Sequence, residues 1–233
     1  LVQMLTPRAC WNFLHDTLNV QSLVESDIAY SPMSLGSLTN GITPLDMAGA
    51  YQMYANGGMR TQPYCYTRVL DSRGNVVLEN RRAPQRVLDY DTATVMNKLL
   101  QRVTNAAPGT GTPANLGALN IPVAGKTGTT DDDVDQWFVG VTPYYVGVCW
   151  VGYDDQFRRD DEGNLLYDGY GRKIPNTVRY SQYPPPLLWK DVMMKVHEGL
   201  EPKDFAGSSS VIALKYCALT GYAATPQCEN AFT

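Results

Sequence analysis

The residues best suited to chemistry lie in one short run, residues 123–130, which reads Val-Ala-Gly-Lys-Thr-Gly-Thr-Thr. Lys126 supplies a positive charge, and Thr127 and Thr129 supply hydroxyl groups that can donate hydrogen bonds. Gly128 has no side chain, so another backbone or a ligand can come close to the chain there. These groups suit a substrate that carries a carboxylate and a carbonyl group to be attacked. The run therefore indicates one wall of a binding cleft.

Three strands are expected to position this run. Residues 121–130, 137–141 and 146–153 are apolar segments of strand length, and the turn at 142–145 makes the last two an antiparallel pair. Apolar side chains occupy both faces of 146–153, which predicts a strand buried on both sides in a sheet covered by helices. The predicted fold class is α/β (α+β), an antiparallel sheet flanked by helices.

Helices are predicted from capping residues and from apolar residues that recur every three or four positions. Residues 7–19 and 91–104 show this periodicity. Another helix begins with Thr43 as its N-cap and Pro44 at its first position, and a last helix opens at Pro186. The apolar positions that mark one face of these helices are Leu45, Ala48, Ala55, Val95, Leu99, Val103, Leu188, Val192, Val196 and Leu200.

The segments between these elements are expected to be peripheral. Residues 63–80 predict a hairpin, because two strand-forming runs flank a turn sequence at 71–75. Residues 28–42 are short, polar and rich in turn residues, and residues 154–184 indicate an irregular excursion. The chain is expected to be loop-like from residue 201 onward.

Composition excludes several classes of function. The chain has 233 residues, of which 44% are hydrophobic and 18% charged, as in a folded protein with a sizeable core. Its net charge of -4, without a basic block, argues against nucleic acid as a partner. No apolar run reaches the length needed to span a bilayer. The opening residues read as if cut from a longer protein, so a fragment or a processed chain is expected.

Two further runs invite a ligand-binding interpretation that the sequence does not favour. The glycine-rich segment 108–113 lacks the Gly-Lys-Ser/Thr ending of a phosphate-binding loop, and no apolar strand precedes it. The carboxylates of residues 131–133 are adjacent, whereas a calcium loop needs alternating ligands and a glycine. Neither a metal nor a cofactor is therefore expected.

The five cysteines form no Cys-x-x-Cys pair, and with only His15 and His197 available a structural zinc site is not expected. Cys149 lies in an apolar strand and is expected to be a small buried hydrophobe. Cys217 and Cys228 lie in the polar tail, where they either form a disulfide, which would require an oxidising compartment, or stay as thiols.

The wider pattern resembles the transpeptidase domain of class A penicillin-binding proteins. Lys-Thr-Gly is one of the motifs of this family and of the related serine β-lactamases. The resemblance covers most of residues 30–228. The segments that carry it are 43–48, 51–58, 109–111, 124–130, 137–143, 150–154, 189–191 and the tail from Cys217 to Cys228.

The resemblance implies a D,D-transpeptidase that cross-links peptidoglycan stem peptides through an acyl-serine enzyme and is acylated by β-lactams. Carried over, Lys126 would be catalytic, supplying charge and assisting proton movement. Thr127 and Thr129 would bind the substrate carboxylate, and Gly128 would keep the strand clear for the substrate backbone. The backbone N–H of Thr129 would form half of an oxyanion hole.

The sequence departs from the family in one respect. None of its ten serines begins a Ser-x-x-Lys or Ser-x-Asn motif. Both motifs lie N-terminal to this region in the family, so the nucleophile is expected on an N-terminal segment of the same protein that is not in this chain. Residues 1–200 would be the C-terminal part of an incomplete transpeptidase domain, and 201–233 a tail. The implied location is the extracytoplasmic face of a bacterial membrane.

Two alternatives stay open. The same fold supports a D,D-carboxypeptidase or β-lactamase, in which water accepts the acyl group instead of an amine. It would equally support a non-catalytic cell-wall-binding or sensor domain that kept the cleft without the nucleophile. A Ser-x-x-Lys motif upstream in the parent protein would exclude the second alternative.

Overall fold

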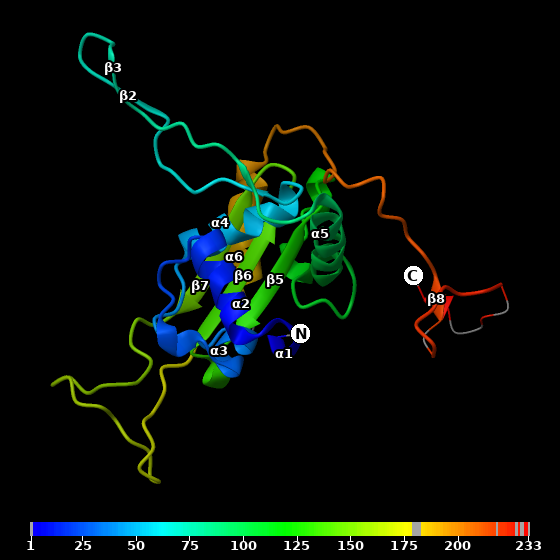
Figure 1. The fold of residues 1–233 in the computed structure, drawn as a ribbon. Helices are drawn as coiled ribbons and strands as arrows, with labels where there is room; N and C mark the ends of the chain where they lie inside the picture. Colours follow the sequence, from blue (N-terminus) through cyan, green and yellow to red (C-terminus); the bar gives the residue numbers. More distant parts are fainter. Residues whose placement is uncertain (1, 179–182, 218, 227, 229–230, 233) are drawn as a thin grey trace.

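A three-stranded antiparallel sheet lies at the centre of the computed structural model, which describes residues 2–178, 183–217, 219–226, 228 and 231–232 (Figure 1). Its strand order is β5-β6-β7. The strands are β5 (Ala124–Thr129), β6 (Asp135–Val141) and β7 (Val146–Gly152). All three predicted strands and their antiparallel pairing are confirmed, and the Thr142 N–H donates to the carbonyl of Tyr145 (2.8 Å) to close the predicted turn.

Helices cover both faces of the sheet, as predicted. They are α4 (Pro44–Ala55), α5 (Tyr90–Asn105) and α6 (Pro184–Val196). On one face, Leu100 of α5 packs with Ala124 and Val141, and α4 completes this cluster. On the other face, Trp189 of α6 meets the ring of Phe138 edge-on, with centroids 5.4 Å apart. Side chains alternate between the two faces along β5 and β6. Every second residue therefore faces α4 and α5, and the residues between them face α6.

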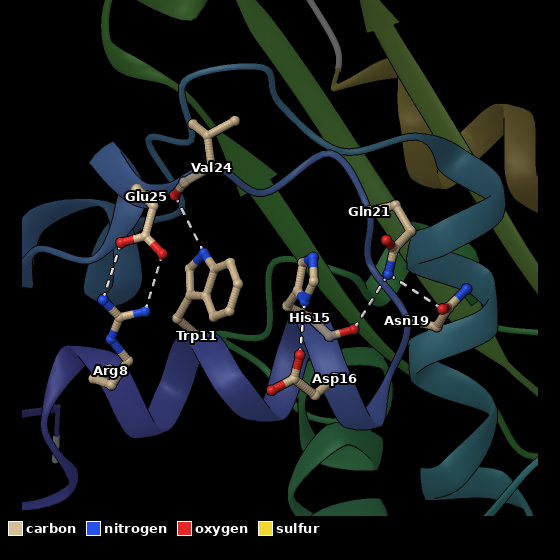
Figure 2. Close-up of polar contacts among 8 residues, drawn as sticks. All are labelled: Arg8, Trp11, His15, Asp16, Asn19, Gln21, Val24 and Glu25. Carbon is tan, nitrogen blue, oxygen red and sulfur yellow. Dashed lines mark hydrogen bonds and ion pairs between the residues drawn. The ribbon is translucent and has the colours of Figure 1, made fainter.

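The N-terminal segment folds back onto α4. It comprises α1 (Val2–Leu5), α2 (Pro7–Asn12), the π-helix Phe13–Thr17, the 3-10 helix Glu25–Asp27 and α3 (Tyr30–Leu35). Figure 2 shows how the helix is held to the loop that follows, since Trp11 donates to the carbonyl of Val24 (3.2 Å) and Arg8 pairs with Glu25 (3.0 Å). Behind these contacts, Leu18 and Leu23 pack on α4.

Two long excursions project from this body (Figure 1). One is the predicted hairpin, in which β2 (Arg68–Leu70) is shorter than expected and pairs with β3 (Val76–Glu79). The other is the loop 154–178, where three isolated bridges form. The remaining elements are short: β1 (Met59–Arg60), β4 (Gln85–Arg86), β8 (Tyr216–Cys217), β9 (Ala231–Phe232) and the 3-10 helices Thr112–Ala114, Gly117–Leu119 and Asp131–Asp133.

The prediction of an irregular segment at 28–42 was wrong in part, because α3 forms there. Pro32, one of the turn residues of this segment, occupies the third position of α3. A proline in the first turn costs no hydrogen bond, since the N–H groups there have no partner inside the helix. Similarly, α6 begins at Pro184, two residues before the predicted start, because its first turn accepts consecutive prolines.

The predicted apolar faces were the least accurate part of the expectation. On α6, Leu188, Val192 and Val196 are exposed, while Trp189 and Met193 are buried. In α4 and α5 too, several of the predicted apolar positions are exposed while other positions are buried. There Val95, Leu99 and Leu45 are exposed, and the buried positions are Ala93, Thr94, Asn97, Leu100, Thr104, Gly49, Ala50 and Met53. Strand β7 is half-buried along its length, not buried on both sides, because it is an edge of the described sheet.

The segment after α6 stays close to the body before the tail begins. Phe205 packs beside Leu100, and the Ser208 N–H donates to the Thr94 hydroxyl (3.0 Å). The domain boundary placed at residue 200 stays a prediction. Among the described residues no helix combines the length and the apolar character needed to cross a membrane.

Candidate active-site strand

Strand β5 carries the four predicted site residues, and its pairing with β6 shows which face of the sheet each side chain occupies. Thr127 lies opposite Phe138 and Thr129 opposite Gln136. Because Phe138 packs against α6, both threonines belong to the face of the sheet that α6 covers. Lys126 and Gly128 belong to the opposite face.

Along β5, the backbone N–H and carbonyl groups of successive residues point alternately toward β6 and toward the other edge of β5. The Thr130 N–H donates to the carbonyl of Asp135 (3.0 Å), so the N–H of Thr130 points toward β6. Directions alternate along a strand, and the Thr129 N–H therefore points to the opposite edge. In the part of the chain that the structure describes, β5 pairs with β6 alone, so this N–H faces an open edge.

Lys126 reaches the same open edge. Its side chain is exposed, and Nζ donates to the carbonyl oxygen of Thr127 (2.8 Å), which also points away from β6. The charge of Lys126, the Thr127 carbonyl that it contacts and the Thr129 N–H thus lie along one border of the sheet. This border can bind an extended substrate backbone by adding it as a strand, and it can stabilise a negative oxygen.

The two threonine hydroxyls are each held by a hydroxyl from another part of the chain. Thr127 Oγ1 lies 2.7 Å from Thr110 Oγ1, and Thr129 Oγ1 donates to the hydroxyl of Tyr183 (3.3 Å). Sequence reasoning placed Thr110 in the loop 108–113 without assigning it a role, although Gly109-Thr110-Gly111 was one of the family segments. It missed Tyr183, for which no motif gave a signal.

Gly128 differs from the glycines beside it. A Cβ added at Gly125 would lie 2.7 Å from the Phe138 ring, and one at Gly140 would lie 2.5 Å from the Trp189 ring, so the core requires both glycines. A Cβ at Gly128 would meet only Cβ of Trp137, at 3.4 Å, which is ordinary contact. The fold of the described chain therefore does not explain Gly128, whereas a ligand on this face would.

The acidic run after β5 forms the 3-10 helix Asp131–Asp133. Within the described ranges no cluster of three His, Cys, Asp or Glu side chains could hold a metal ion.

Two tryptophans pack together on β6 and β7. The ring centroids of Trp137 and Trp150 lie 6.2 Å apart, and Trp150 Nε1 donates to Asp135 (2.7 Å).

The two histidines lie in different settings, His15 half-buried at the surface and His197 inside the fold. His15 stacks on Trp11, with ring centroids 4.2 Å apart. His197 is buried, its Nδ1 donates to the Met193 carbonyl (2.8 Å) and its Nε2 lies 2.8 Å from the Thr142 hydroxyl. The carbonyl can only accept, so Nδ1 carries a proton.

The cysteines fall into different environments. Cys149 is half-buried against the α6 side of the core, and burial raises the pKa of its thiol. Cys217 and Cys228 are both thiols in the structure. Hydrogen bonds from Thr220, with smaller contributions from Leu219 and from the Cys228 side chain, lower the pKa of the Cys217 thiol to about 7. A disulfide between them is one of the two alternatives that the sequence leaves open.

Comparisons with known proteins agree with this arrangement. The chain is 32% identical over 204 residues to penicillin-binding protein 1A of Clostridium tetani, covering 85% of this chain and 24% of that protein. It therefore spans about a quarter of the length of this relative. In fold it is similar to penicillin-binding protein 1A from Haemophilus influenzae, with a TM-score of 0.70 at 17% identity, over 97% of this chain and 36% of that one.

A second solved structure, penicillin-binding protein 3 from Mycobacterium tuberculosis complexed with ampicillin, has a TM-score of 0.56 at 22% identity. That match covers 86% of this chain and 48% of the other. The family model for the penicillin binding protein transpeptidase domain matches residues 15–154, more than half of the chain. The chain therefore belongs to the penicillin-binding protein transpeptidase domain family.

Proposed function

We propose that this chain is part of a peptidoglycan D,D-transpeptidase and supplies the wall of its active site that binds the substrate backbone. The observation that supports this most directly is the border of β5. There the charge of Lys126, the hydroxyls of Thr127 and Thr129 and the outward Thr129 N–H lie within four consecutive residues of one open strand.

The roles follow from the chemistry of acyl transfer. A serine oxygen attacks the carbonyl carbon of a peptide that ends in a carboxylate, the C–N bond breaks, and the terminal amino acid leaves as an amine. An amine of a second stem peptide then takes the acyl group from the serine. The carboxylate would bind the Thr127 and Thr129 hydroxyls, and Lys126 would supply positive charge and assist proton movement.

The Thr129 N–H would stabilise the oxygen that becomes negative in the tetrahedral intermediate. One such donor contributes about 3–4 kcal/mol of barrier reduction in comparable sites. Gly128 would leave room for the substrate backbone, since a Cβ there would meet only Cβ of Trp137 at ordinary contact distance. A β-lactam presents a carbonyl and a carboxylate in a similar relationship, so β-lactams would acylate the same serine. The structurally similar protein solved with ampicillin supports this expectation.

The nucleophile belongs to an N-terminal segment of the same protein that would carry Ser-x-x-Lys and Ser-x-Asn, since no serine of this chain is followed by lysine three positions later. The protein would act at the extracytoplasmic face of a bacterial membrane, where stem peptides are found.

The test is labelling of the parent protein with a fluorescent penicillin, followed by peptide mapping of the adduct. We expect one adduct, on a serine N-terminal to this chain, and none on residues 1–233 expressed alone. Absence of any adduct, with an upstream sequence that lacks Ser-x-x-Lys, would instead favour the non-catalytic wall-binding domain. If the adduct forms and water accepts the acyl group even when an acceptor amine is present, the protein is a carboxypeptidase or β-lactamase.

A further inference from the structure

The geometry points to Tyr183 as a positioning residue for the oxyanion-binding end of β5, an inference that rests on the proposed function. The Tyr183 hydroxyl lies 2.5 Å from the carbonyl oxygen of Gly128 and 2.9 Å from that of Trp137. It also accepts a hydrogen bond from Thr129 Oγ1 at 3.3 Å. One side chain therefore contacts three groups at the point where β5 and β6 pair beside the candidate site.

The carbonyl of Gly128 and the N–H of Thr129 belong to the same peptide group. In a trans peptide these two bonds point in opposite directions. By donating to the Gly128 oxygen on the β6 side, Tyr183 holds the plane of this peptide so that the Thr129 N–H faces the open edge.

Gly128 itself does little to restrain this peptide group. Gly128 has no Cβ, so its backbone has a wider range of accessible conformations than any other residue type. No side chain of Gly128 packs to fix the following peptide. A hydrogen bond to the carbonyl also polarises the peptide group, which makes its N–H a stronger donor. Tyr183 thus compensates for the freedom that the glycine introduces.

The tyrosine is delivered by a rigid element. It immediately precedes α6, whose first three residues are prolines with fixed φ. Trp189 anchors the helix, since its Nε1 donates to the carbonyl of Gly147 (3.0 Å) while its ring packs edge-on against Phe138. The phenol is therefore presented from the covered face of the sheet, on the same side as the Thr127 and Thr129 side chains, and is itself half-buried.

The experiment compares wild-type parent protein with Tyr183→Phe and with Tyr144→Phe. The control also loses a tyrosine hydroxyl that donates to a carbonyl, that of Glu201 at 2.8 Å, but it lies beyond the other end of β6. The acylation rate constant and the initial binding constant for a penicillin are measured separately. We expect the rate constant of Tyr183→Phe to fall on the order of tenfold, less than the loss of a whole oxyanion donor. Initial binding and the melting temperature should change little.

A second readout is the infrared stretching frequency of the acyl-enzyme carbonyl, which rises when hydrogen bonding in the oxyanion hole weakens. We expect a higher frequency in Tyr183→Phe and an unchanged one in Tyr144→Phe. A ring-fluorinated tyrosine at position 183 keeps the hydroxyl, so its acylation rate constant and carbonyl frequency should stay near the wild-type values. This comparison remains possible even if Tyr183→Phe folds poorly.

The outcomes separate this inference from the proposed function. If the wild-type protein is acylated normally and Tyr183→Phe matches it in rate constant and carbonyl frequency, the positioning role alone is overturned. Wild-type protein that is not acylated would overturn the proposed function and this inference with it.

Discussion

The hydroxyl oxygens of Thr110 and Thr127 lie 2.7 Å apart, although 17 positions separate the two residues in the sequence. This contact links the glycine-rich loop before β5 to the strand itself, and Gly111 makes it possible by packing against the Phe138 ring, where a Cβ would lie at 3.1 Å. The loop thus holds one of the hydroxyls expected to bind the substrate carboxylate.

Replacing Thr110 by valine should weaken substrate binding without unfolding the protein. Valine keeps the shape of threonine but loses the hydroxyl, so Thr127 loses a partner worth about 1 kcal/mol. We expect the efficiency of acylation by a penicillin to fall about three- to tenfold. Thr92→Val, at an exposed position of α5, is the matched control and should leave the efficiency unchanged. Equal effects of the two variants would contradict the role of Thr110.

Two glycine-to-alanine variants should separate function from folding. In Gly140→Ala the new Cβ would lie 2.5 Å from the Trp189 ring, so we expect a loss of about 1–3 kcal/mol in the free energy of unfolding. In Gly128→Ala the Cβ meets only ordinary contact, so stability should be retained while penicillin labelling falls. Thermal unfolding and labelling of both variants give the comparison. A Gly128→Ala variant that labels normally would show that the open space beside β5 is not used.

The centre of the site was predictable because its signals are local. Lys126, Thr127 and Gly128 are adjacent, and the strand that carries them is followed by two more strands over short connections. The predicted antiparallel sheet was confirmed for these reasons. Likewise, Thr43 and Pro44 gave the start of α4 through a cap that involves only neighbouring residues, since Thr43 Oγ1 accepts from the Asp46 N–H (3.1 Å).

What could not be predicted depends on contacts between distant segments. Tyr183 lies 55 positions from Gly128, and only the packing of α6 on the sheet brings them together. The buried faces of the helices failed for a related reason. On α6, Trp189 outcompetes the regularly spaced Val192 because the glycines of β6 and β7 leave a space that fits an indole. Periodicity shows that a helix has apolar positions but not which of them meets a complementary surface.

His197 should prove structural when replaced. It is 1% exposed, and both ring nitrogens have partners, the Met193 carbonyl and the Thr142 hydroxyl. His197→Leu removes the ring's hydrogen bonds to both groups in a buried setting. The Met193 carbonyl keeps the backbone N–H of residue 197, and the Thr142 hydroxyl keeps its contacts with residues 144 and 145, so we expect a loss of about 1–3 kcal/mol. His15→Gln, at a half-buried surface position, should cost less than about 1 kcal/mol. Urea unfolding of both variants measures this, and a double-mutant cycle with Thr142→Val should show coupling.

The reactivity of Cys217 should depend on pH in a way that reveals its hydrogen bonds. The thiolate is the form that reacts with an alkylating agent, and its fraction rises as pH rises through the pKa. Because the pKa of this thiol is lowered to about 7, alkylation of the reduced protein should be half-maximal near pH 7. Thr220→Val removes the largest contribution and should move the profile toward the ordinary thiol pKa of 9.0. Mass spectrometry of alkylated peptides gives the rates, and identical profiles would contradict the assignment.

The pair Cys217 and Cys228 should also form the disulfide that the sequence suggested. The two side chains are hydrogen-bonded, and a Cys217 thiol with a pKa of about 7 is a good attacking group at neutral pH. With oxidised glutathione as the oxidant, the Cys217 thiolate would first form a mixed disulfide, which the Cys228 thiolate then attacks to release the second glutathione thiol. We expect non-reducing peptide mapping to recover one cross-linked peptide containing both residues. In Cys228→Ser the product should stop at the mixed disulfide on Cys217. Recovery of Cys217 linked instead to the exposed Cys65 would show that proximity in the tail does not decide the pairing.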